Sequence, residues 1–314
     1  MTWDTLEPRL EEETQRGFSG TVLAARNGEI ILHRGFGLAS RDRDIPNTTN
    51  TLFAIGSTPI DFTHAAILKL VDLGKLRIAE PITSFFKTVP PDKQNITIDQ
   101  LMTGRSGLRD FHGIPGVDED LDLSWIDRDT AVRRILTGEL RFEPGTEQAH
   151  SHSAWGLLAV IVELVSGQEY EAFLRVQYFK PTGMTRTGLY PHALKFDPDE
   201  VAVGYGHIRI RPVNSPVHWG RTSWLVMGSG GMVSTAADLF RWNQALRSGA
   251  LLSPESTKQF RGGGIAAGDN DRGFLTLFNT DLDTIVIVCA NSHEEPGDHT
   301  TQVSLAAVSV ARNR

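Results

Sequence analysis

The sequence predicts an α+β fold in which both ends of the chain contribute strands to one sheet and a mainly helical region lies between them. Apolar runs with turn residues between them occur at residues 18–55 and 270–290, whereas residues 76–220 show mainly helical patterns. No internal repeat or flexible linker interrupts the 314 residues, and a chain of this length can bury a substantial core. We therefore expect two intimately packed parts. One is an α/β region of residues 1–75 with 221–314, and the other is the helical region of residues 76–220.

Composition narrows the classes of partner. Hydrophobic residues make up 40% and charged residues 22% of the chain, which is ordinary for a globular protein. The net charge of −7 comes with no basic stripe, so we expect no nucleic-acid partner. No apolar run reaches the roughly 18 residues of a membrane span. The acidic first 16 residues do not resemble a signal peptide, which predicts a cytoplasmic protein as given, or a periplasmic or secreted one if a leader has been removed.

The predicted sheet begins with a hairpin. Residues 21–25 and 30–32 are apolar runs separated by Asn27 and Gly28, and Asn-Gly between such runs is the strongest short hairpin signal. Further strands are predicted at residues 35–39, 273–278 and 284–290. We expect a mixed α/β region from these two ends of the chain, with an antiparallel sheet flanked by the first and last helices.

The helix that matters most for function is predicted at residues 59–73. Ser57 or Thr58 can cap it, Pro59 suits its first turn, and Gly74 ends it. Its apolar residues recur at helical spacing: Phe62, Ala65, Ala66, Leu70 and Leu73. Other helices are predicted at residues 7–15, 154–165, 236–247 and 302–310.

The single cysteine cannot form an internal disulfide. Cys289 follows the apolar run of residues 285–288, so we expect a buried thiol in a core strand and not a reactive nucleophile.

Eight motifs occur in a fixed order along nearly the whole chain, and together they resemble one known family. They lie at residues 18–22, 53–57, 73–76, 96–103, 106–108, 142–146, 179–188 and 230–239. In this order they are similar to the serine β-lactamase-like family, which includes class C β-lactamases, penicillin-binding proteins and β-lactamase-type esterases. The resemblance implies a β-lactamase/transpeptidase-like fold with an active-site cleft between its two parts.

The chemistry of that family is acyl transfer through a serine, helped by a lysine one helical turn later and by a tyrosine or serine across the cleft. The resemblance places the serine at Ser57, but the lysine position is Ile60, which has no titratable group. Asp61 is turned about 100° away on the helix and Lys69 lies about three turns along it, so neither replaces the lysine. We expect Ile60 to be buried one turn below Ser57.

The second family motif, usually Tyr-x-Asn before an apolar helix, aligns with His150-Ser151-His152. A histidine can act as a base near neutral pH, so His150 is a candidate base for Ser57, with His152 beside it. The alternative is that both histidines only line the cleft wall. Two histidines without a placed third ligand are weak evidence for a metal, so we predict neither a metal nor another cofactor.

The third family motif lies on an edge strand beside the serine, as Lys-Thr-Gly or His-x-Gly. Its best match is Arg261 followed by Gly262, Gly263 and Gly264. Arginine can hold an anion in a bidentate manner and glycines allow close backbone approach, although a plain glycine-rich turn is the alternative.

Two features beside these motifs also bear on the site. We expect Trp155, and Trp219 or Trp224, at its wall, and Gly104 stands where relatives often carry a histidine.

These residues predict a serine hydrolase or acyltransferase that acts on an ester or amide of a small molecule. Standard β-lactamase activity is not expected, because removing members of a catalytic unit typically costs several powers of ten. Two alternatives stay open. The fold is repurposed for non-covalent chemistry of an isomerase, cyclase or lyase type that uses His150 and His152, or the protein binds a small molecule or peptide without catalysis.

Overall fold

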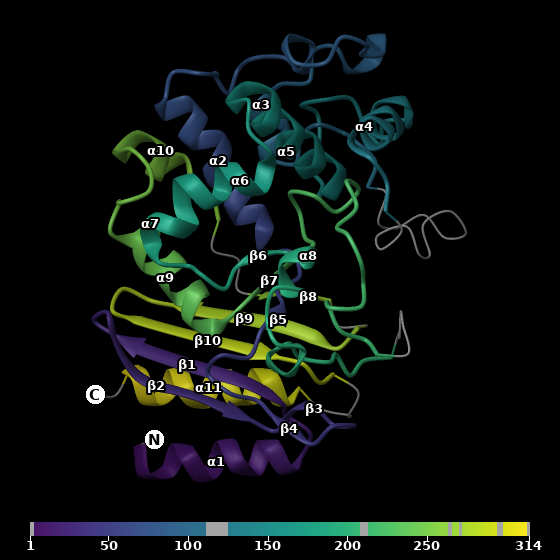
Figure 1. Cartoon of the computed structure of the whole chain (residues 1–314). Coiled ribbons are helices and arrows are strands. Elements are labelled where there is room, and N and C mark those ends of the chain that lie inside the picture. Colours follow the sequence, from purple (N-terminus) through teal and green to yellow (C-terminus); the bar gives the residue numbers. More distant parts are fainter. Residues whose placement is uncertain are drawn as a thin grey trace.

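The computed structural model describes residues 3–110, 125–207, 213–262, 266–269, 272–293 and 298–312. Figure 1 shows a helical half stacked on one face of a sheet, with the first and last helices, α1 (Trp3–Gln15) and α11 (His299–Arg312), on the other face. The α+β architecture predicted from the sequence is therefore the observed one.

The main sheet has five strands in the order β2-β1-β10-β9-β8. Their bounds are β1 Gly20–Arg26, β2 Glu29–Phe36, β8 Ala266–Asp269, β9 Phe274–Thr280 and β10 Thr284–Ala290. The two ends of the chain meet in the centre of this sheet, where Val22 lies opposite Val288. Every pairing between these strands is antiparallel. Short hairpin connections such as the one between β1 and β2 require antiparallel neighbours.

The first hairpin forms as its sequence predicts. Asn27 and Gly28 both have positive φ, 51° and 82°, which the two-residue turn between right-twisted strands requires. Strand β2 ends at Phe36, however, because Gly37 also has a positive φ of 61°. The chain then forms β3 (Leu38–Ser40), which pairs with β4 (Ile45–Pro46) in a separate two-stranded sheet.

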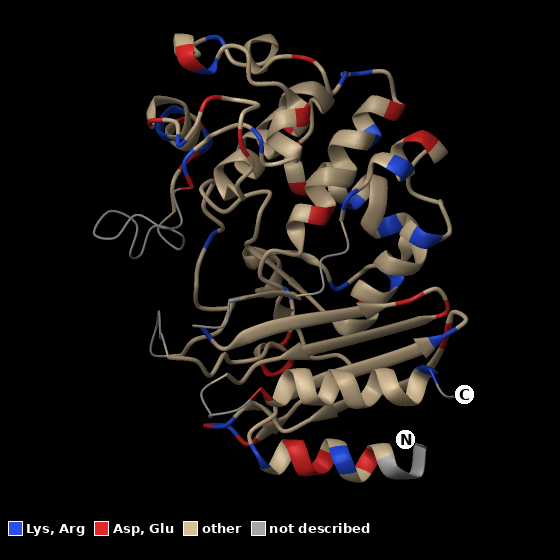
Figure 2. Ribbon diagram, turned by 180° about the vertical axis from the view of Figure 1, so that it is seen from behind, with Lys and Arg blue, Asp and Glu red and all other residues tan. Residues whose placement is uncertain are grey.

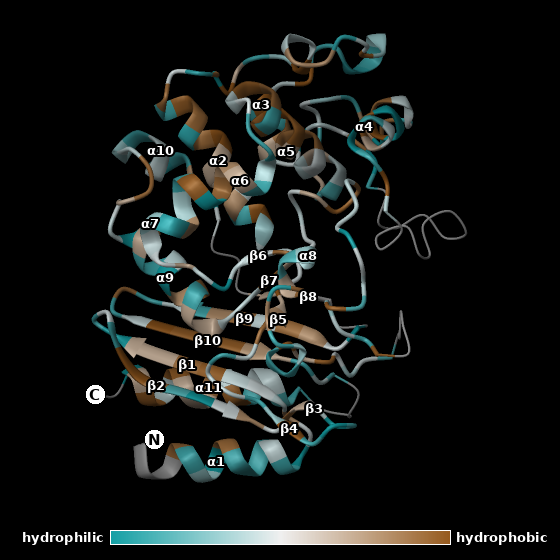
Figure 3. Cartoon of the chain, in the orientation of Figure 1, coloured by the Kyte–Doolittle hydropathy of each residue, from teal (hydrophilic) through white to brown (hydrophobic). Residues whose placement is uncertain are grey.

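Alternation along the strands divides the core into two clusters. Leu23 of β1 and Ile287 of β10 face the helical half, whereas their neighbours Val22 and Val288 face α1 and α11. Figure 3 shows the strongly hydrophobic central strands between these two layers. Because successive side chains of a strand point to opposite faces, a sheet buried on both faces reads as a continuous apolar run. Cys289 is one of its fully buried residues, and burial raises the pKa of its thiol to about 12, as expected for a core cysteine.

The long helices form where the sequence predicts them. They are α2 (Pro59–Asp72), α5 (His152–Ser166) and α9 (Ala236–Arg247). Gly74 and Gly167 follow α2 and α5 with φ of 65° and 71°, a conformation that ends helices. Of the predicted apolar face of α2, only Leu73 is exposed, because it lies just beyond the last turn.

The remaining helical elements are short. They are η1 (Ile82–Ser84), η2 (Pro91–Lys93), α3 (Ile98–Met102), α4 (Arg128–Thr137), α6 (Tyr170–Leu174), the π-helical η4 (Arg175–Phe179), α7 (Lys180–Thr182), α8 (Tyr190–Ala193), η5 (Pro198–Glu200) and α10 (Pro254–Gln259). A three-stranded sheet in the order β5-β7-β6 joins β5 (Phe53–Ala54), β7 (Met232–Ser234) and β6 (Gly188–Leu189).

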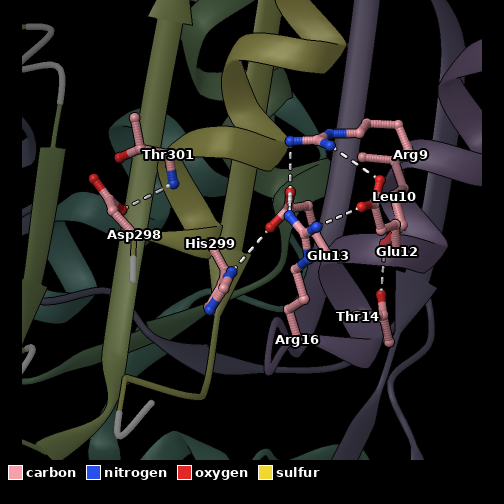
Figure 4. A network of polar contacts seen from close by, with 9 residues as sticks. All are labelled: Arg9, Leu10, Glu12, Glu13, Thr14, Arg16, Asp298, His299 and Thr301. Atoms are coloured by element: carbon pink, nitrogen blue, oxygen red, sulfur yellow. Dashed lines mark hydrogen bonds and ion pairs between the residues drawn. The ribbon is translucent and has the colours of Figure 1, made fainter. Parts of the chain in front are cut away.

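A buried carboxylate joins the two ends of the chain. Glu13 of α1 is 1% exposed and accepts contacts from Arg9 at 2.7 Å, Arg16 at 3.5 Å and His299 of α11 at 2.9 Å (Figure 4).

Along the rest of the described chain, charged residues of both signs are interspersed (Figure 2). Among the described residues no helix combines the length and the apolar character of a membrane span.

Candidate active site

Ser57 lies in a tight turn between a short strand and the first turn of α2. Strand β5 is held by β7, through the pair Phe53 and Ser234, and Gly56 then turns the chain with φ of 51°. Ser57 is half-buried, and its carbonyl accepts a hydrogen bond from Ile60 N–H at 3.0 Å. The unpaired N–H groups and dipole of a helix N-terminus favour negative charge at such a position. The Ser57 hydroxyl makes no hydrogen bond to any residue that the structure describes.

The edge strand β8 lies directly against this turn. A Cβ atom added to Gly56 would lie 2.5 Å from the backbone nitrogen of Gly268, so the two backbones touch. Strand β8 pairs with β9 on one side and ends the sheet on the other. Because an edge strand presents unpaired N–H groups, β8 brings backbone donors close to Ser57.

The predicted third motif does not form this strand. Arg261 and Gly262 are irregular and precede β8, while Gly263 and Gly264 lie outside the described residues. Gly262 packs against α2 instead, since a Cβ atom there would lie 2.6 Å from Asp61 Oδ1. Glycines weaken a strand, and the ring of Phe260 holds the segment to α2 by packing 5.1 Å from the ring of His64.

His64 is a buried histidine that the sequence analysis missed. Its ring also lies 5.9 Å from that of Trp155, so α2, α5 and the segment before Arg261 meet there. Burial, and then the positive charge of Arg261, lower the pKa of His64 to about 4, which makes it neutral near pH 7. Its spacing was the available signal, because Ser57, Ile60 and His64 recur on one helix face.

The family's lysine position holds an apolar side chain. Ile60 is half-buried, less than we expected, and packs against the main hydrophobic cluster. Lys69 donates to the carbonyl oxygen of Leu251 at 3.1 Å, so its amine is engaged near the other end of α2.

His150 and His152 are brought together at the N-terminus of α5. Ser151 caps the helix by accepting a hydrogen bond from Ala154 N–H at 3.2 Å, which places one histidine on either side of the cap. Their Nε2 atoms lie 3.4 Å apart, and His152 Nδ1 lies 2.7 Å from Asp110 Oδ2. Asp110, which the sequence analysis did not single out, completes a linear chain of three titratable groups.

A glycine loop holds the segment that leads to His150. The N–H of Ala149 donates to Gly104 O at 2.8 Å, and Gln148 Nε2 donates to Thr103 O at 3.0 Å. A Cβ atom on Gly104, whose φ is 70°, would lie 2.7 Å from Ala149 O. The histidine that relatives often carry here therefore has no room in this chain. Asp110 follows the motif at residues 106–108, and this position beside a family motif was the signal for it.

His150 is tuned to be neutral. Burial first, and then the neighbouring His152, lower the pKa of His150, while the charge of Asp110 acts in the opposite direction. A neutral imidazole can accept a proton, and we find no hydrogen bond between His150 and Ser57. Catalytic hydrogen bonds are often long or poorly aligned without a substrate and tighten when it binds.

The tryptophans divide into two environments. Trp155 is buried beside His64, and Trp219 is buried between Tyr190 and Phe274, with ring centroids 5.0 and 5.6 Å away. Trp224 lines a cavity of about 560 Å³ whose lining contains neither Ser57 nor His150. Within the part of the chain that the structure describes, no group of three or more His, Cys, Asp or Glu side chains is arranged to hold a metal ion.

Comparison with known proteins decides the family. The sequence profile of the Beta-lactamase family matches residues 4–300. The chain belongs to the Beta-lactamase family. It is 33% identical over 243 residues to a Bacillus subtilis (strain 168) protein named as a penicillin-binding protein, PbpX, and these residues cover 76% of this chain. It is 27% identical over 275 residues to esterase EstB of Burkholderia gladioli, over 77% of this chain.

Solved structures of this family confirm the fold. The D-amino acid amidase of Ochrobactrum anthropi SV3 has a TM-score of 0.78 at 22% identity and covers 99% of both chains. FmtA of Staphylococcus aureus has a TM-score of 0.78 at 20% identity, covering 99% of this chain and 89% of FmtA. The chain spans only 58% of the length of PbpX and 69% of that of EstB, so parts of both relatives have no counterpart in it.

Proposed function

We propose that this member of the Beta-lactamase family is a serine hydrolase or acyltransferase that acts on an ester or amide of a small molecule, with Ser57 as nucleophile and His150 as base. The position of Ser57 carries the proposal. Ser57 is half-buried, directly precedes the first turn of α2, and follows Gly56, which touches the edge strand β8. Backbone N–H groups aimed at a developing oxyanion supply one of the largest contributions to acyl transfer.

The proposed reaction has two balanced steps. His150 takes the hydroxyl proton of Ser57 while Oγ attacks the substrate carbonyl carbon, and the leaving alcohol or amine departs with that proton as its bond to the carbonyl breaks. Water, or an acceptor alcohol in acyl transfer, then attacks the acyl-enzyme with the same histidine as base. Ser57 regains its proton when the acyl group leaves.

Relatives support acyl chemistry of this class. The names of the similar proteins include a penicillin-binding protein, an esterase and a D-amino acid amidase. The names of the esterase and the amidase concern acyl groups bonded to oxygen and to nitrogen. The apolar Ile60 and the histidine at 150 argue against the standard β-lactamase version, because both usual proton carriers are replaced.

Hydrolysis of p-nitrophenyl acetate by the full chain tests the proposal. We expect Ser57→Ala and His150→Ala each to lower kcat/KM by about 10²–10⁴-fold, and to a similar degree, because paired catalytic groups act as a unit. A fluorophosphonate probe should label the wild-type protein and not Ser57→Ala. The exposed Ser84→Ala and His218→Ala are matched controls and should change neither result.

A second function is favoured by one observation. His152 of the histidine pair is hydrogen-bonded to Asp110, whereas the Ser57 hydroxyl has no hydrogen bond to either histidine. Non-covalent proton transfer by His150 and His152 would leave turnover of a suitable substrate intact in Ser57→Ala and lost in His150→Ala. A protein in which neither substitution changes any turnover would be a binding protein.

A further inference from the structure

We infer that Asp110 is a positioning residue of a three-group chain, Asp110–His152–His150, and that Nδ1 of His150 is the nitrogen that accepts the proton of Ser57. The inference rests on the proposed function for its catalytic meaning. Its structural part, the protonation pattern of the two imidazoles, stands without it.

The chain fixes the protonation of His152. Asp110 Oδ2 lies 2.7 Å from His152 Nδ1, a short distance typical of a charge-assisted hydrogen bond. An ionised carboxylate only accepts hydrogen bonds, so Nδ1 of His152 carries the hydrogen. In the neutral form of His152, which has a single N–H, Nε2 is then the nitrogen without a hydrogen.

That bare nitrogen fixes the protonation of His150. The two Nε2 atoms lie 3.4 Å apart with the rings nearly perpendicular, at an interplanar angle of 86°. Two bare nitrogens facing each other would repel, so Nε2 of His150 carries the hydrogen and points it at His152. The free lone pair of His150 is then on Nδ1, which is the nitrogen available to Ser57.

The three hydrogen-bonded side chains also stabilise the protonated form of His150, which catalysis requires. When His150 accepts a proton it becomes a cation, and its Nε2–H is held by His152, whose own N–H is held by the carboxylate. Burial first, and then His152, lower the pKa of His150, and the charge of Asp110 opposes this lowering. The third group of a nucleophile–base–carboxylate set acts in this way, by orienting the base and stabilising its charged form. Asp110 does so through His152, without contact to His150 in the described chain.

Local structure supports the placement of a negative charge here. Asp110 lies beside the capped N-terminus of α5, a helix of 15 residues, where the dipole favours an anion. The segment from Thr103 to Asp110 is tied to the segment before His150, because the carbonyls of Gly104 and Thr103 accept hydrogen bonds from Ala149 and Gln148. The two ends of the relay are thus held by one loop.

Nitrogen-15 NMR of the histidine side chains tests the protonation pattern without any substrate. At pH 7.5, above the ordinary pKa of a histidine, we expect wild-type His152 to carry its hydrogen on Nδ1 and His150 on Nε2. Asp110→Ala should remove this preference from both rings. Wild-type His150 with its hydrogen on Nδ1 would overturn the inference.

The pH dependence of kcat tests the catalytic role. Asp110→Asn should lower the plateau by about 10²–10⁴-fold, as loss of the carboxylate does in serine hydrolase triads. It should also move the midpoint to lower pH, because the charge that raises the pKa of His150 is gone. Asp283→Asn, which removes an equally single charge from a surface pair with Arg26, is the matched control. An unchanged plateau and midpoint in folded Asp110→Asn would overturn the role.

A double substitution distinguishes an effect of Asp110 that is transmitted through His152 from an effect that is independent of His152. If Asp110 acts through His152, then Asp110→Asn should cause no further loss of the kcat plateau in a His152→Asn background. Independent, additive effects would contradict the relay. The two proposals fail separately, because the predicted NMR pattern without any turnover refutes only the hydrolase, whereas turnover with the wrong pattern refutes only the relay.

Discussion

The pKa values of the histidines His64 and His150 are lowered mainly by burial. His64 has no charged partner of opposite sign among the groups that shift it, and its pKa of about 4 lies well below the ordinary 6.5. The unfolded chain therefore binds a proton at this residue between about pH 6.5 and 4, where the folded protein does not. Stability contributed by neutral His64 is present above pH 6.5 and is lost as the pH falls toward 4.

We expect the free energy of unfolding to fall with acid less steeply in His64→Phe than in the wild type. The difference between the two slopes should total on the order of 3 kcal/mol between pH 7 and 4, since one pKa unit corresponds to about 1.4 kcal/mol. Urea unfolding at a series of pH values measures it. Parallel curves of unfolding free energy against pH for His64→Phe and the wild type would show that His64 is solvated in the folded state. The control is His218→Ala, at an exposed histidine, whose curve should run parallel to that of the wild type.

At this scale the sequence could indicate the residues that follow family motifs, and no others. Ser57, His150 and His152 were predicted by resemblance, and the structure places the two histidines in contact. Asp110 escaped because its partner lies 42 positions away and the pairing depends on how two loops fold together. The sequence left a binding strand and a glycine-rich turn open at Arg261, where the chain is irregular, because a glycine run carries almost no periodic signal.

Among the elements, the contact between the Ser57 turn and β8 is the one on which the proposed oxyanion site depends. Two glycines make it possible. Gly56 has a positive φ and touches Gly268, so a side chain at position 56 both strains the turn and pushes the edge strand away. The sequence predicted the helix after this turn within one residue, since Pro59 and Gly74 mark its ends. It could not predict which strand lies beside the turn, because that pairing joins segments over 200 residues apart.

We expect Gly56→Ala to be destabilised and to lose most of the esterase activity. Left-handed backbone costs a non-glycine residue about 1–2 kcal/mol, and displacement of β8 adds to it. Gly74→Ala is a matched control, because Gly74 has a similar φ of 65° but nothing within 4 Å of an added Cβ atom. Melting temperatures and p-nitrophenyl acetate turnover compare them. Equal behaviour of the two variants would mean that β8 does not rely on this contact.

The N-terminal and C-terminal parts of the chain are joined to each other in the main sheet and in the helices beside it. Strands β1 and β10 pair across the centre of the sheet, and α1 packs against α11 with Glu13 between them. The division into residues 1–75 with 221–314 and residues 76–220 stays a prediction. Figure 1 shows that α2, which this division gives to the first part, runs among the helices of the second.

We expect Glu13→Gln to lower the free energy of unfolding by about 1–3 kcal/mol, because an amide cannot accept from Arg9, Arg16 and His299 as a carboxylate does. Glu12→Gln, on the exposed side of the same helix, removes the same charge and should cost less than about 0.5 kcal/mol. Chemical denaturation of both variants checks this. A similar loss for both would place the effect in the net charge of α1 and not in the buried network.

The pairing of β1 with β10 also dictates the order in which the chain can be assembled during synthesis. Thr21 and its partner Cys289 are separated by almost the whole chain. During synthesis, the edge of β1 that pairs with β10 therefore stays unpaired until β10 has been made. Contacts of such sequence separation are slow to form, and unpaired strand edges are prone to aggregate. Nascent chains that end before residue 284 should therefore be the ones that require a chaperone, while a chain a few tens of residues longer can close its sheet unaided.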